Sequence, residues 1–370
     1  MPLFMDLHIV PGITAQGVAE AHVLDLKIQE EYQCSCMTYW IDEVNNSAFC
    51  LIEAPNANAV RELHNKAHGL LPFNIIEVNK DAVKSFLGRL YDPEIPGIPQ
   101  EELKVFNDPA YRCMVFIEVK DPVLLKLHSS EKRSKGLLFH FYQIIKEYSD
   151  RFSGEIAQNN GAASSLICFS YSENALKCAL EINNAFTQDE KHMLGIKISI
   201  NAGMPVTSSE RIFGETIDFG EILLYTSRDH NIVLATGVKD IATGHFTDLG
   251  IKKITTHSPA EEKFLKNIFK ILKQHSADEN FGIEKLCSLA GLSKSSLNRH
   301  LQHLTSRSPN SLLKEFRLNH ALKLLRAGEN ISNIAFITGF RSPSYFSKCF
   351  KQHFHLSPSE YLEQLKKNSL

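Results

Sequence analysis

Hydrophobic and polar positions along the first 80 residues follow two periods, one typical of strands and one typical of helices. Alternation predicts strands over residues 3–10, 37–44, 47–53 and 73–78, and helical spacing predicts helices over residues 14–31 and 56–67. Asn45 and Asn46 supply the turn between the second and third strands. The order βαββαβ predicts a ferredoxin-like sandwich in which both helices cover one face of the sheet.

The middle of the chain mixes the same two periods. Strand patterns occupy residues 111–122 and 196–205, a helical pattern occupies 135–154, and a hairpin followed by a helix accounts for 155–186. This succession predicts a second α+β sandwich.

The last third of the chain predicts helices only. Residues 281–304 and 330–354 each read as a helix, a turn at Gly291 or Gly339, and a second helix. A helix over residues 309–328 joins the two units. Its roughly 18 residues at about 1.5 Å each span ~27 Å, so that with the flanking turns the two second helices would lie about one DNA turn, ~34 Å, apart.

Capping signals indicate where the helices of this region begin. Ser293 is an N-cap for the second helix of the first unit, and Ser342, followed by a proline, is an N-cap for that of the second. Ser258, Pro259 and Glu261 form a capping-box pattern that predicts the start of the whole C-terminal region.

Residues 91–110 contain four prolines, which predicts a semi-rigid linker. With the helix start at 258, this linker divides the chain into three predicted domains, 1–90, 111–256 and 258–370.

Composition restricts the class of protein. The chain has 370 residues, 43% hydrophobic and 22% charged, which is ordinary for a globular protein. Its start lacks a signal-peptide pattern, and no run of about 18 apolar residues occurs. The eight cysteines have irregular spacing and no C-x-x-C pair. We therefore expect a reduced, cytoplasmic protein with no membrane partner.

Charge is divided unevenly along the chain. From residue 260 onward there are 17 Lys and Arg against 9 Asp and Glu, a net +8. The whole chain has 40 and 42, so 23 basic and 33 acidic residues remain for the rest, a net −10. A basic tail on an acidic body indicates a polyanion such as DNA as the partner of the tail.

The second helix of each predicted unit has an apolar face and a polar face. The polar side chains, which can reach base edges and phosphates, are Ser295, Asn298, Arg299 and Gln302 in the first unit and Ser344, Ser347, Lys348 and Lys351 in the second. The alternative is an ordinary bundle of amphipathic helices with solvated polar faces. The presence of two units with matching N-caps, in a region of net positive charge, favours DNA binding over that alternative.

Two stretches of this region, LAGLSKSSLNRHL (289–301) and ISNIAFITGFRSPSYFSKCFKQHFHLSPSEYL (331–362), carry a resemblance to a known family. Residues 262–365 resemble the DNA-binding domain of AraC-type transcription regulators. The resemblance implies double-stranded DNA as a partner. It also implies base-contacting positions at Ser295, Asn298, Arg299, Ser344, Ser347 and Lys348.

The order of elements over residues 113–243 is similar to that of class III nucleotide cyclase domains. Such cyclases hold two divalent metals with two acidic residues. The resemblance places the first at Glu118 or Asp121. The second belongs at the tip of the hairpin, where this chain has Gly161 and Ala162, and alanine has no oxygen ligand.

The resemblance also implies an Asn and an Arg on a later helix, and these positions fall near Asp218 and Ile222. An apolar side chain cannot stabilise the charge of a transferring phosphate. We therefore predict that the middle domain is not an enzyme but a sensing or pairing module of a homodimer.

Four histidines of the N-terminal segment are candidate metal ligands. His8 lies on the first strand, His22 on the first helix, and His64 and His68 one turn apart on the second helix. Further candidates are Asp25, Cys50 and Glu53. This donor set suits zinc, nickel, copper or cobalt. The alternative is that His68, which precedes Gly69, merely completes a helix end.

The stretches MPLFMDLHIVPG, AHVLDL, YWIDE, FCLIEAPNANAV and LHNKAHGLLPFNIIEV resemble a small family of bacterial ferredoxin-like domains described as nickel-binding. The resemblance implies a transition metal, nickel or zinc, and the same candidate ligands. We therefore expect a cytoplasmic AraC-type transcription regulator that responds to metal through its N-terminal domain, with any further effector unknown. The alternatives are a divergent nucleotide cyclase with a DNA-binding tail and a metal-buffering protein.

Overall fold

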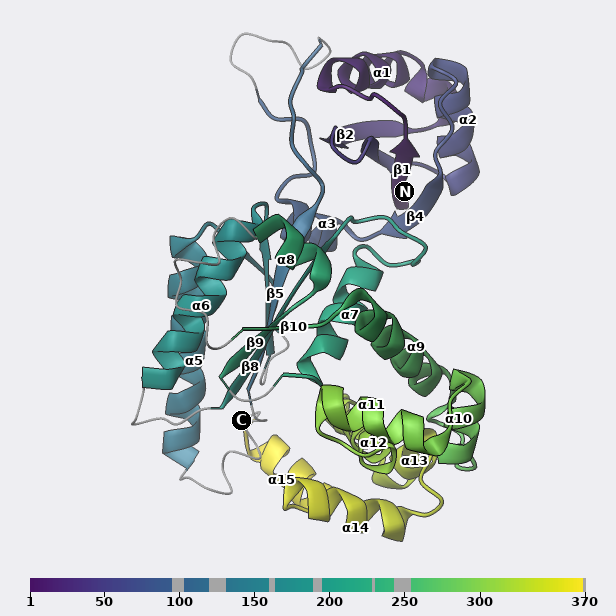
Figure 1. Ribbon diagram of the computed structural model, residues 1–370. Helices are drawn as coiled ribbons and strands as arrows, with labels where there is room; N and C mark the ends of the chain where they lie inside the picture. The colour runs from purple at the N-terminus through teal and green to yellow at the C-terminus, as the bar shows by residue number, and fades with distance from the viewer. Residues whose placement is uncertain are drawn as a thin grey trace.

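The computed structural model describes residues 1–94, 103–119, 131–159, 164–188, 195–227, 230–242 and 254–368. They form two α/β domains followed by a helical domain, arranged in chain order (Figure 1). The three fold classes expected from the sequence are confirmed. Within the described ranges, no helix combines the length and apolar character needed to cross a membrane.

The N-terminal domain is a ferredoxin-like sandwich. Its elements are β1 (Leu3–Ile9), α1 (Ala15–Ile28), the 3-10 helix η1 (Gln29–Tyr32), β2 (Ser35–Asp42), β3 (Ser47–Glu53), α2 (Ala57–Ala67) and β4 (Asn74–Val78). The antiparallel sheet has the order β2-β3-β1-β4, as a βαββαβ fold requires. Thr14 and Asn56 cap the two helices, because each side chain accepts a hydrogen bond from a backbone amide three residues on.

The hydrophobic pattern considered for this domain does not predict one of its helices. Helix α3 (Lys80–Leu87) begins at Asn79, whose side chain accepts hydrogen bonds from two backbone amides of the first turn. Val83, Phe86 and Leu87 of this helix are buried. They lie in one apolar cluster with residues of the N-terminal sheet and the middle domain, so α3 helps to join the two domains.

The two faces of the N-terminal sheet have different neighbours. Met5 and Leu7 of β1 belong to the apolar cluster that also contains α3 and Phe213 of the middle domain. Because side chains alternate along a strand, Asp6 and His8 point to the opposite face, toward α1 and α2. Both are buried there.

The proline-rich stretch 91–110 is not simply a spacer, contrary to expectation. Its described end, residues 103–110, lies along the N-terminal sheet. The Tyr39 hydroxyl donates a hydrogen bond to the carbonyl of Lys104 over 2.9 Å. The Tyr39 ring also stacks on Phe106, with centroids 4.2 Å apart. These residues therefore complete the edge of the N-terminal domain.

The middle domain has a six-stranded mixed sheet. Its elements are β5 (Arg112–Val119), α5 (Glu131–Arg151), β6 (Glu155–Asn159), β7 (Ser164–Phe169), α6 (Ser172–Gln188), β8 (Ile196–Gly203), α7 (Gly214–Leu224), β9 (Asn231–Leu234), α8 (Thr236–Ala242) and β10 (Ile254–Thr256). The sheet order is β10-β9-β8-β5-β7-β6, with parallel pairing from β8 through β10. Helices α5 and α6 cover one face and α7 covers the other (Figure 1).

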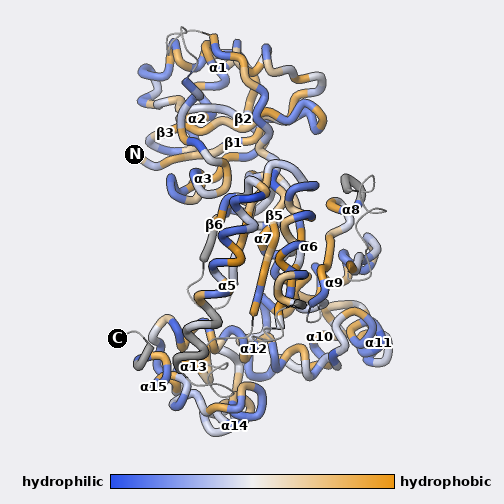
Figure 2. The backbone as a smooth tube through the Cα atoms, turned by 90° about the vertical axis from the view of Figure 1, so that its left-hand side faces the viewer, coloured by the Kyte–Doolittle hydropathy of each residue, from blue (hydrophilic) through white to orange (hydrophobic). Residues whose placement is uncertain are grey.

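Helix α7 lies close to the sheet because Gly220 has no side chain. A Cβ atom at Gly220 would lie 2.1 Å from Cε2 of Phe116 on β5. The Ser199 hydroxyl on β8 donates a hydrogen bond to the Gly220 carbonyl over 2.7 Å. In Figure 2, α7 and β5 contain long hydrophobic stretches where they meet. The helix is thus fixed against the centre of the sheet.

The C-terminal domain consists of two helix-turn-helix units joined by a long helix. Its elements are α9 (Pro259–His275), α10 (Ile283–Ala290), α11 (Lys294–Thr305), α12 (Pro309–Arg326), α13 (Ile331–Ile337), α14 (Pro343–Phe354) and α15 (Pro358–Asn368). The predicted caps at Ser258, Ser293 and Ser342 are confirmed. Gly291 and Gly339 make the turns with φ of 66° and 79°, a region that favours glycine.

The two units pack differently. The first unit, with α9, shares a continuous apolar core with α7 and the middle sheet. The second unit packs with α12 and α15 in a separate core. Polar contacts reinforce the first arrangement: Arg307 Nη1 donates to the Tyr225 carbonyl over 2.8 Å, and Asn319 Nδ2 donates to the Tyr225 hydroxyl over 3.1 Å.

Candidate metal centre and DNA-binding surface

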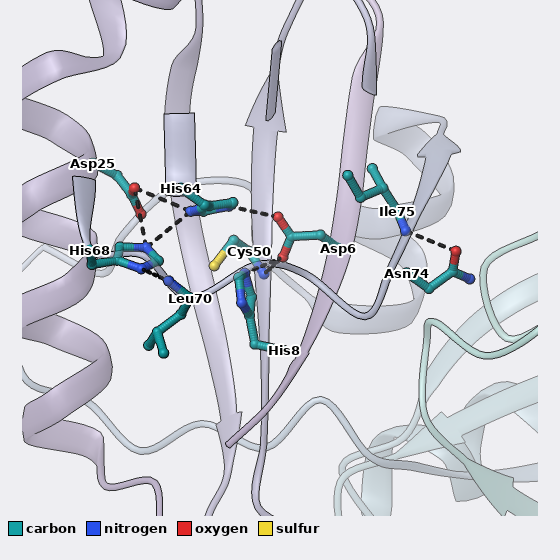
Figure 3. A network of polar contacts seen from close by, with 9 residues as sticks. All are labelled: Asp6, His8, Asp25, Cys50, His64, His68, Leu70, Asn74 and Ile75. Atoms are coloured by element: carbon teal, nitrogen blue, oxygen red, sulfur yellow. Dashed lines mark hydrogen bonds and ion pairs between the residues drawn. The ribbon is translucent and has the colours of Figure 1, made fainter. Parts of the chain in front are cut away.

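Polar side chains converge between the sheet and the helices of the N-terminal domain, in an otherwise apolar interior (Figure 3). They are Asp6 and His8 from β1, Asp25 from α1, Cys50 from β3, His64 from the last turn of α2, and His68, the C-cap residue of that helix. All except the half-buried His68 are buried. Four of the six, His8, Asp25, Cys50 and His68, line a pocket that opens onto this cluster, and the nearby His22 lines it too.

His64 lies at the centre of the cluster and is fully buried. Its Nε2 lies 2.8 Å from Asp6 Oδ2, and its Nδ1 lies 3.1 Å from both Asp25 Oδ1 and His68 Nε2. His68 Nε2 lies 3.4 Å from the same Asp25 oxygen. His64 Nδ1, Asp25 Oδ1 and His68 Nε2 therefore form a triangle of potential ligand atoms. Asp6 lies beside the other ring nitrogen of His64.

The charges of the cluster depend on one another. Burial by itself lowers the pKa of His64, but Asp6 and Asp25 outweigh burial and raise that pKa to about 10. Burial by itself raises the pKa of both carboxyl groups, yet the neighbouring histidines hold the pKa of Asp6 and Asp25 below its ordinary value. Without metal, an imidazolium thus lies between two carboxylates. Burial, together with Asp6, raises the pKa of the Cys50 thiol.

His8 and Cys50 form a second group of potential ligands with Asp6 and His64. His8 Nε2 is buried 3.4 Å from Asp6 Oδ1, and it has no hydrogen-bond partner among the described residues. One potential ligand atom from each of Asp6, His8, Cys50 and His64 lies within 4.8 Å of the others. A set of buried nitrogen, oxygen and sulfur donors at these separations fits a transition metal.

Two residues predicted as ligands lie apart from this cluster. His22 lines the same pocket, but its Nε2 lies 3.4 Å from Asp92 Oδ2. Glu53 forms an ion pair with Lys80 of α3, on the far side of the sheet. Since Glu53 is three residues after Cys50 on β3, strand alternation places the two side chains on opposite faces.

Asp6 belongs to the cluster although it is missing from the predicted ligands. Its signal is present in the sequence, because Asp6 and His8 are two residues apart on one strand and share a face. An acidic residue inside an apolar strand, next to a candidate ligand, is the pattern that would have identified it.

The predicted DNA-contacting side chains lie on outward faces of α11 and α14. The exposed members are Ser295, Asn298, Arg299, Gln302, Ser344, Lys348 and Lys351, and Ser347 is half-buried. Leu297 and Leu301 of α11 and Phe346 and Phe350 of α14 are buried on the opposite faces. The structure therefore leaves these polar residues accessible, and their contacts with DNA stay a prediction.

The expected catalytic positions of the middle domain have other partners. Asp218 forms ion pairs with Arg211 at 2.7 Å and with Lys273 of α9 at 3.0 Å. Ile222 packs against the apolar core that joins α7 to α9. These contacts place both positions in the junction with the C-terminal domain.

The positions expected to hold catalytic metals are only partly described. Glu118 is exposed on β5. Asp121, Gly161 and Ala162 lie outside the described residues.

Comparison with known proteins identifies the two ends of the chain. Residues 286–364 match the family model of a helix-turn-helix domain, and residues 4–78 match that of a nickel responsive protein, SCO4226-like. The C-terminal domain is thus of the AraC helix-turn-helix type and the N-terminal domain is SCO4226-like, as their resemblances imply.

Individual relatives share parts of the chain. Histidine kinase P4 of Formosa agariphila is 38% identical over 107 residues, which are 29% of this chain and 8% of that protein. The HTH-type transcriptional activator RhaS of Mannheimia succiniciproducens is 26% identical over 192 residues, 49% of this chain and 67% of that protein. The chain thus spans a small part of the first relative. The catalytic core of a rhodopsin-guanylyl cyclase is a structural neighbour with 14% identity and a TM-score of 0.32, covering 36% of this chain and 82% of that chain.

Proposed function

We propose that this protein is a DNA-binding transcription regulator whose affinity for DNA responds to a transition metal, nickel or zinc, held by the N-terminal domain. The observation that carries the proposal is the outward exposure of the polar faces of both α11 and α14 in a basic domain. The donor cluster around His64 supports the metal response.

Two kinds of contact would hold the DNA. The exposed Arg299 on α11 is suited to a bidentate contact with a guanine edge in the major groove. Lys351 on α14, also exposed, is suited to a phosphate. Because both helices belong to one domain, we expect them to enter neighbouring major grooves on one face of the duplex.

The metal would be held by Asp25, His64 and His68, with Asp6, His8 and Cys50 as a neighbouring group of donors around the same His64. A bound ion supplies coordination bonds between the two helices and the sheet. Without the ion, the surrounding residues already position these donors, since each ring nitrogen of His64 lies within 3.1 Å of a carboxylate oxygen.

His68 provides a way for ligation to alter the surrounding loop. The Leu70 amide donates a hydrogen bond to His68 Nδ1 over 3.2 Å, so the proton of a neutral ring is on Nε2. A neutral His68 that ligates through Nε2 carries its proton on Nδ1 instead. Ligation is therefore incompatible with the Leu70 hydrogen bond, and the loop after α2 must rearrange.

That loop leads directly to the contact with the middle domain. It enters β4 at Asn74, whose Nδ2 donates to the Thr207 carbonyl over 2.5 Å. The segment after Thr207 contains Phe213, which packs in the apolar cluster with the N-terminal sheet and immediately precedes α7. Helix α7 contacts α9 through the Asp218–Lys273 ion pair. A change at His68 thus has a continuous route to the first helix-turn-helix unit.

We further propose that the middle domain transmits this change and catalyses no reaction. The ion pairs of Asp218 and the apolar packing of Ile222 support a structural role for α7. If the middle domain pairs with a second copy through the sheet face opposite α5 and α6, the paired surface must be one that α7 and α9 do not cover. We expect a homodimer, the commonest assembly, in the cytoplasm, where the eight free cysteines stay reduced.

The experiment that tests DNA binding begins with DNA fragments that co-purify with the full chain. Footprints on these fragments are expected over two adjacent major grooves. Arg299→Ala should cost about 1–3 kcal/mol on the preferred site and relax the preference there. Lys351→Ala should weaken binding to all sequences alike and reduce the salt slope by about 1. A footprint in a single groove, or binding that does not depend on salt, would contradict the proposal.

A further inference from the structure

The two helix-turn-helix units meet beside the long helix α12. The apolar side chains of this helix divide between two cores: Leu312 and Leu313 belong to the core of the first unit, and Leu318 and Leu322 belong to that of the second. Arg317 lies between the two sets and is half-buried. Because each core holds its own unit, the orientation of one unit relative to the other is decided where the two cores meet.

Arg317 joins α12 to the end of α9 and to the loop that leads into the first unit. Its Nε donates a hydrogen bond to the Ser276 carbonyl over 2.8 Å, and its Nη2 donates to the carbonyls of Asp278 and Phe281 over 2.9 and 3.1 Å. Ser276 is the C-cap residue of α9, at a helix end where carbonyls lack partners within the helix. A guanidinium offers several N–H groups in a rigid fork, which a lysine ammonium does not reproduce. The three contacts therefore fix both the position and the direction of this loop.

Gly339, in the turn of the second unit, packs against the same place. It is buried, and its φ of 79° lies in the region that favours glycine. A Cβ atom added at Gly339 would lie 2.2 Å from the Ser276 carbonyl oxygen and 2.9 Å from Arg317 Nε. The turn that leads into α14 is therefore in direct contact with the end of α9 and with the guanidinium that holds it. The two units approach this closely because residue 339 has no side chain.

We propose that Arg317 and Gly339 are positioning residues for DNA recognition. Together they set the distance and the angle between α11 and α14, and thus the spacing of the two DNA segments that the protein recognises. The inference rests on the DNA-binding function proposed above and specifies how the domain selects a site. Two helices held rigidly fit segments about one helical turn, ~34 Å, apart and reject other spacings. Because Arg317 binds protein carbonyls, its loss should change the preference for spacing rather than the preference for a base.

The test compares the affinity of the full chain for its preferred DNA site with its affinity for the same site carrying one extra base pair between the two contacted segments. The insertion moves one segment by about 3.4 Å and rotates it by about 34°. The wild type should lose roughly 10-fold in affinity, as it would for a mismatched base pair. Arg317→Ala should bind the preferred site more weakly than the wild type does, but it should bind the two sites nearly equally. General destabilisation would weaken both sites alike, so the ratio of the two affinities separates positioning from folding.

Each variant has a matched control. Arg326 lies on the same helix and donates from Nε to the Tyr361 hydroxyl within the second unit, so Arg326→Ala should keep the wild-type ratio. Gly339→Ala should lose the preference for the original spacing. Gly328→Ala should keep it, because Gly328 has a φ of 87°, and thus the same backbone strain, but nothing lies within 4 Å of its added Cβ.

Thermal unfolding shows whether each variant folds, and Arg317→Lys replaces Arg317→Ala if the latter does not. A ratio for the Arg317 variant equal to that of the wild type would overturn this inference and leave DNA binding intact. A wild type that binds both spacings equally would have the same consequence. A wild type that binds none of the DNA fragments would overturn the proposed function itself.

Discussion

In the N-terminal domain, the space between sheet and helices contains buried acids and imidazoles, whereas in the middle domain the space between β5 and α7 is filled by apolar side chains. His64 and Asp6 meet at 2.8 Å in the first interior. In the second, Phe116 lies against Gly220, and Ile222 joins the core that continues into α9. The sequence suggested metal ligands in both regions, and among the described residues the donors of the first region lie together.

The difference teaches that one kind of layered fold can serve either as a container for polar donors or as an apolar connection between neighbouring domains. Helix α7 contacts the N-terminal sheet through Phe213 and its neighbours, and it contacts the C-terminal domain through Asp218 and Tyr225. The middle domain therefore lies between the residues that would sense a metal and those that would contact DNA. This position supports the connecting role that we propose for the middle domain.

The largest effect that we predict is on metal affinity. His64→Ala should weaken binding of the tightest ion by more than the ~10–100-fold that is usual for losing an outer-shell partner, because His64 touches both donor groups. Calorimetry with Ni²⁺ on the full chain measures the change. Asp218→Asn, in the middle domain, is the control and should leave the affinity unchanged. Equal metal affinities for wild type and His64→Ala would show that the donors of the N-terminal domain do not bind the metal.

A moderate effect is predicted for stability at the α7 contact. Gly220→Ala inserts a Cβ atom into the ring of Phe116 and should destabilise the middle domain by about 1–3 kcal/mol. Gly237→Ala, on α8, is the matched control, because nothing lies within 4 Å of its added Cβ. That change should be neutral or slightly stabilising. Urea unfolding measures both variants, and equal losses would show that α7 is not packed as described.

Opposite pH dependences of stability are predicted for two buried histidines in the metal-free chain. His64 has a pKa raised to about 10 by its acids, so its stabilising contribution is complete below the unfolded pKa of about 6.5 and is lost as pH rises toward 10. Burial lowers the pKa of His257, whose Nε2 lies 2.9 Å from Thr226 Oγ1. Its contribution is therefore present above about 6.5 and lost as pH falls.

Hydrogen exchange, measured peptide by peptide across pH, separates the two histidines. Opening of the N-terminal domain should increase at alkaline pH, and opening around the start of α9 should increase at acid pH. His64→Gln and His257→Gln should each flatten one dependence alone. If both regions opened in the same direction, the assigned charges would be incorrect.

The smallest predicted effect is an absence of turnover. With ATP or GTP and Mg²⁺ or Mn²⁺, the full chain should make no cyclic nucleotide, since the second acidic ligand of cyclases is replaced at Ala162. Product analysis by chromatography is sufficient. If a cyclic nucleotide formed, and if Glu118→Ala abolished its formation, the middle domain would be catalytic and the prediction would be wrong.

Local patterns in the sequence predict most elements, because period and capping are properties of adjacent residues. The strands and helices of the N-terminal domain begin and end within three residues of their expected positions, and the caps at Ser258, Ser293 and Ser342 are confirmed. Helix α3 was not expected, although its cap Asn79 and its apolar spacing are visible in the sequence.

The packing between domains could not be predicted, because an apolar stripe does not specify its partner. The residues of β1 that face the middle domain, Met5 and Leu7, read in the sequence as ordinary strand residues. The donor cluster could be predicted in part: helical spacing unites His64 and His68, and alternation along single strands would have added Asp6 beside His8 and separated Glu53 from Cys50. Which strand residues face which helix residues could not be predicted, because that depends on the packing of the sheet against α1 and α2.

The most direct test of the central claim is the affinity of the full chain for its preferred DNA site, with and without saturating Ni²⁺ at constant ionic strength. A coupling of about 1–3 kcal/mol, or roughly 5–150-fold in affinity, is expected between the metal and the DNA. The change should vanish in His68→Ala, because that variant lacks both the ligand nitrogen and the acceptor of the Leu70 hydrogen bond, so metal binding no longer alters this loop. Identical DNA affinities for chains with and without bound metal would contradict the account, even if the metal site itself were confirmed.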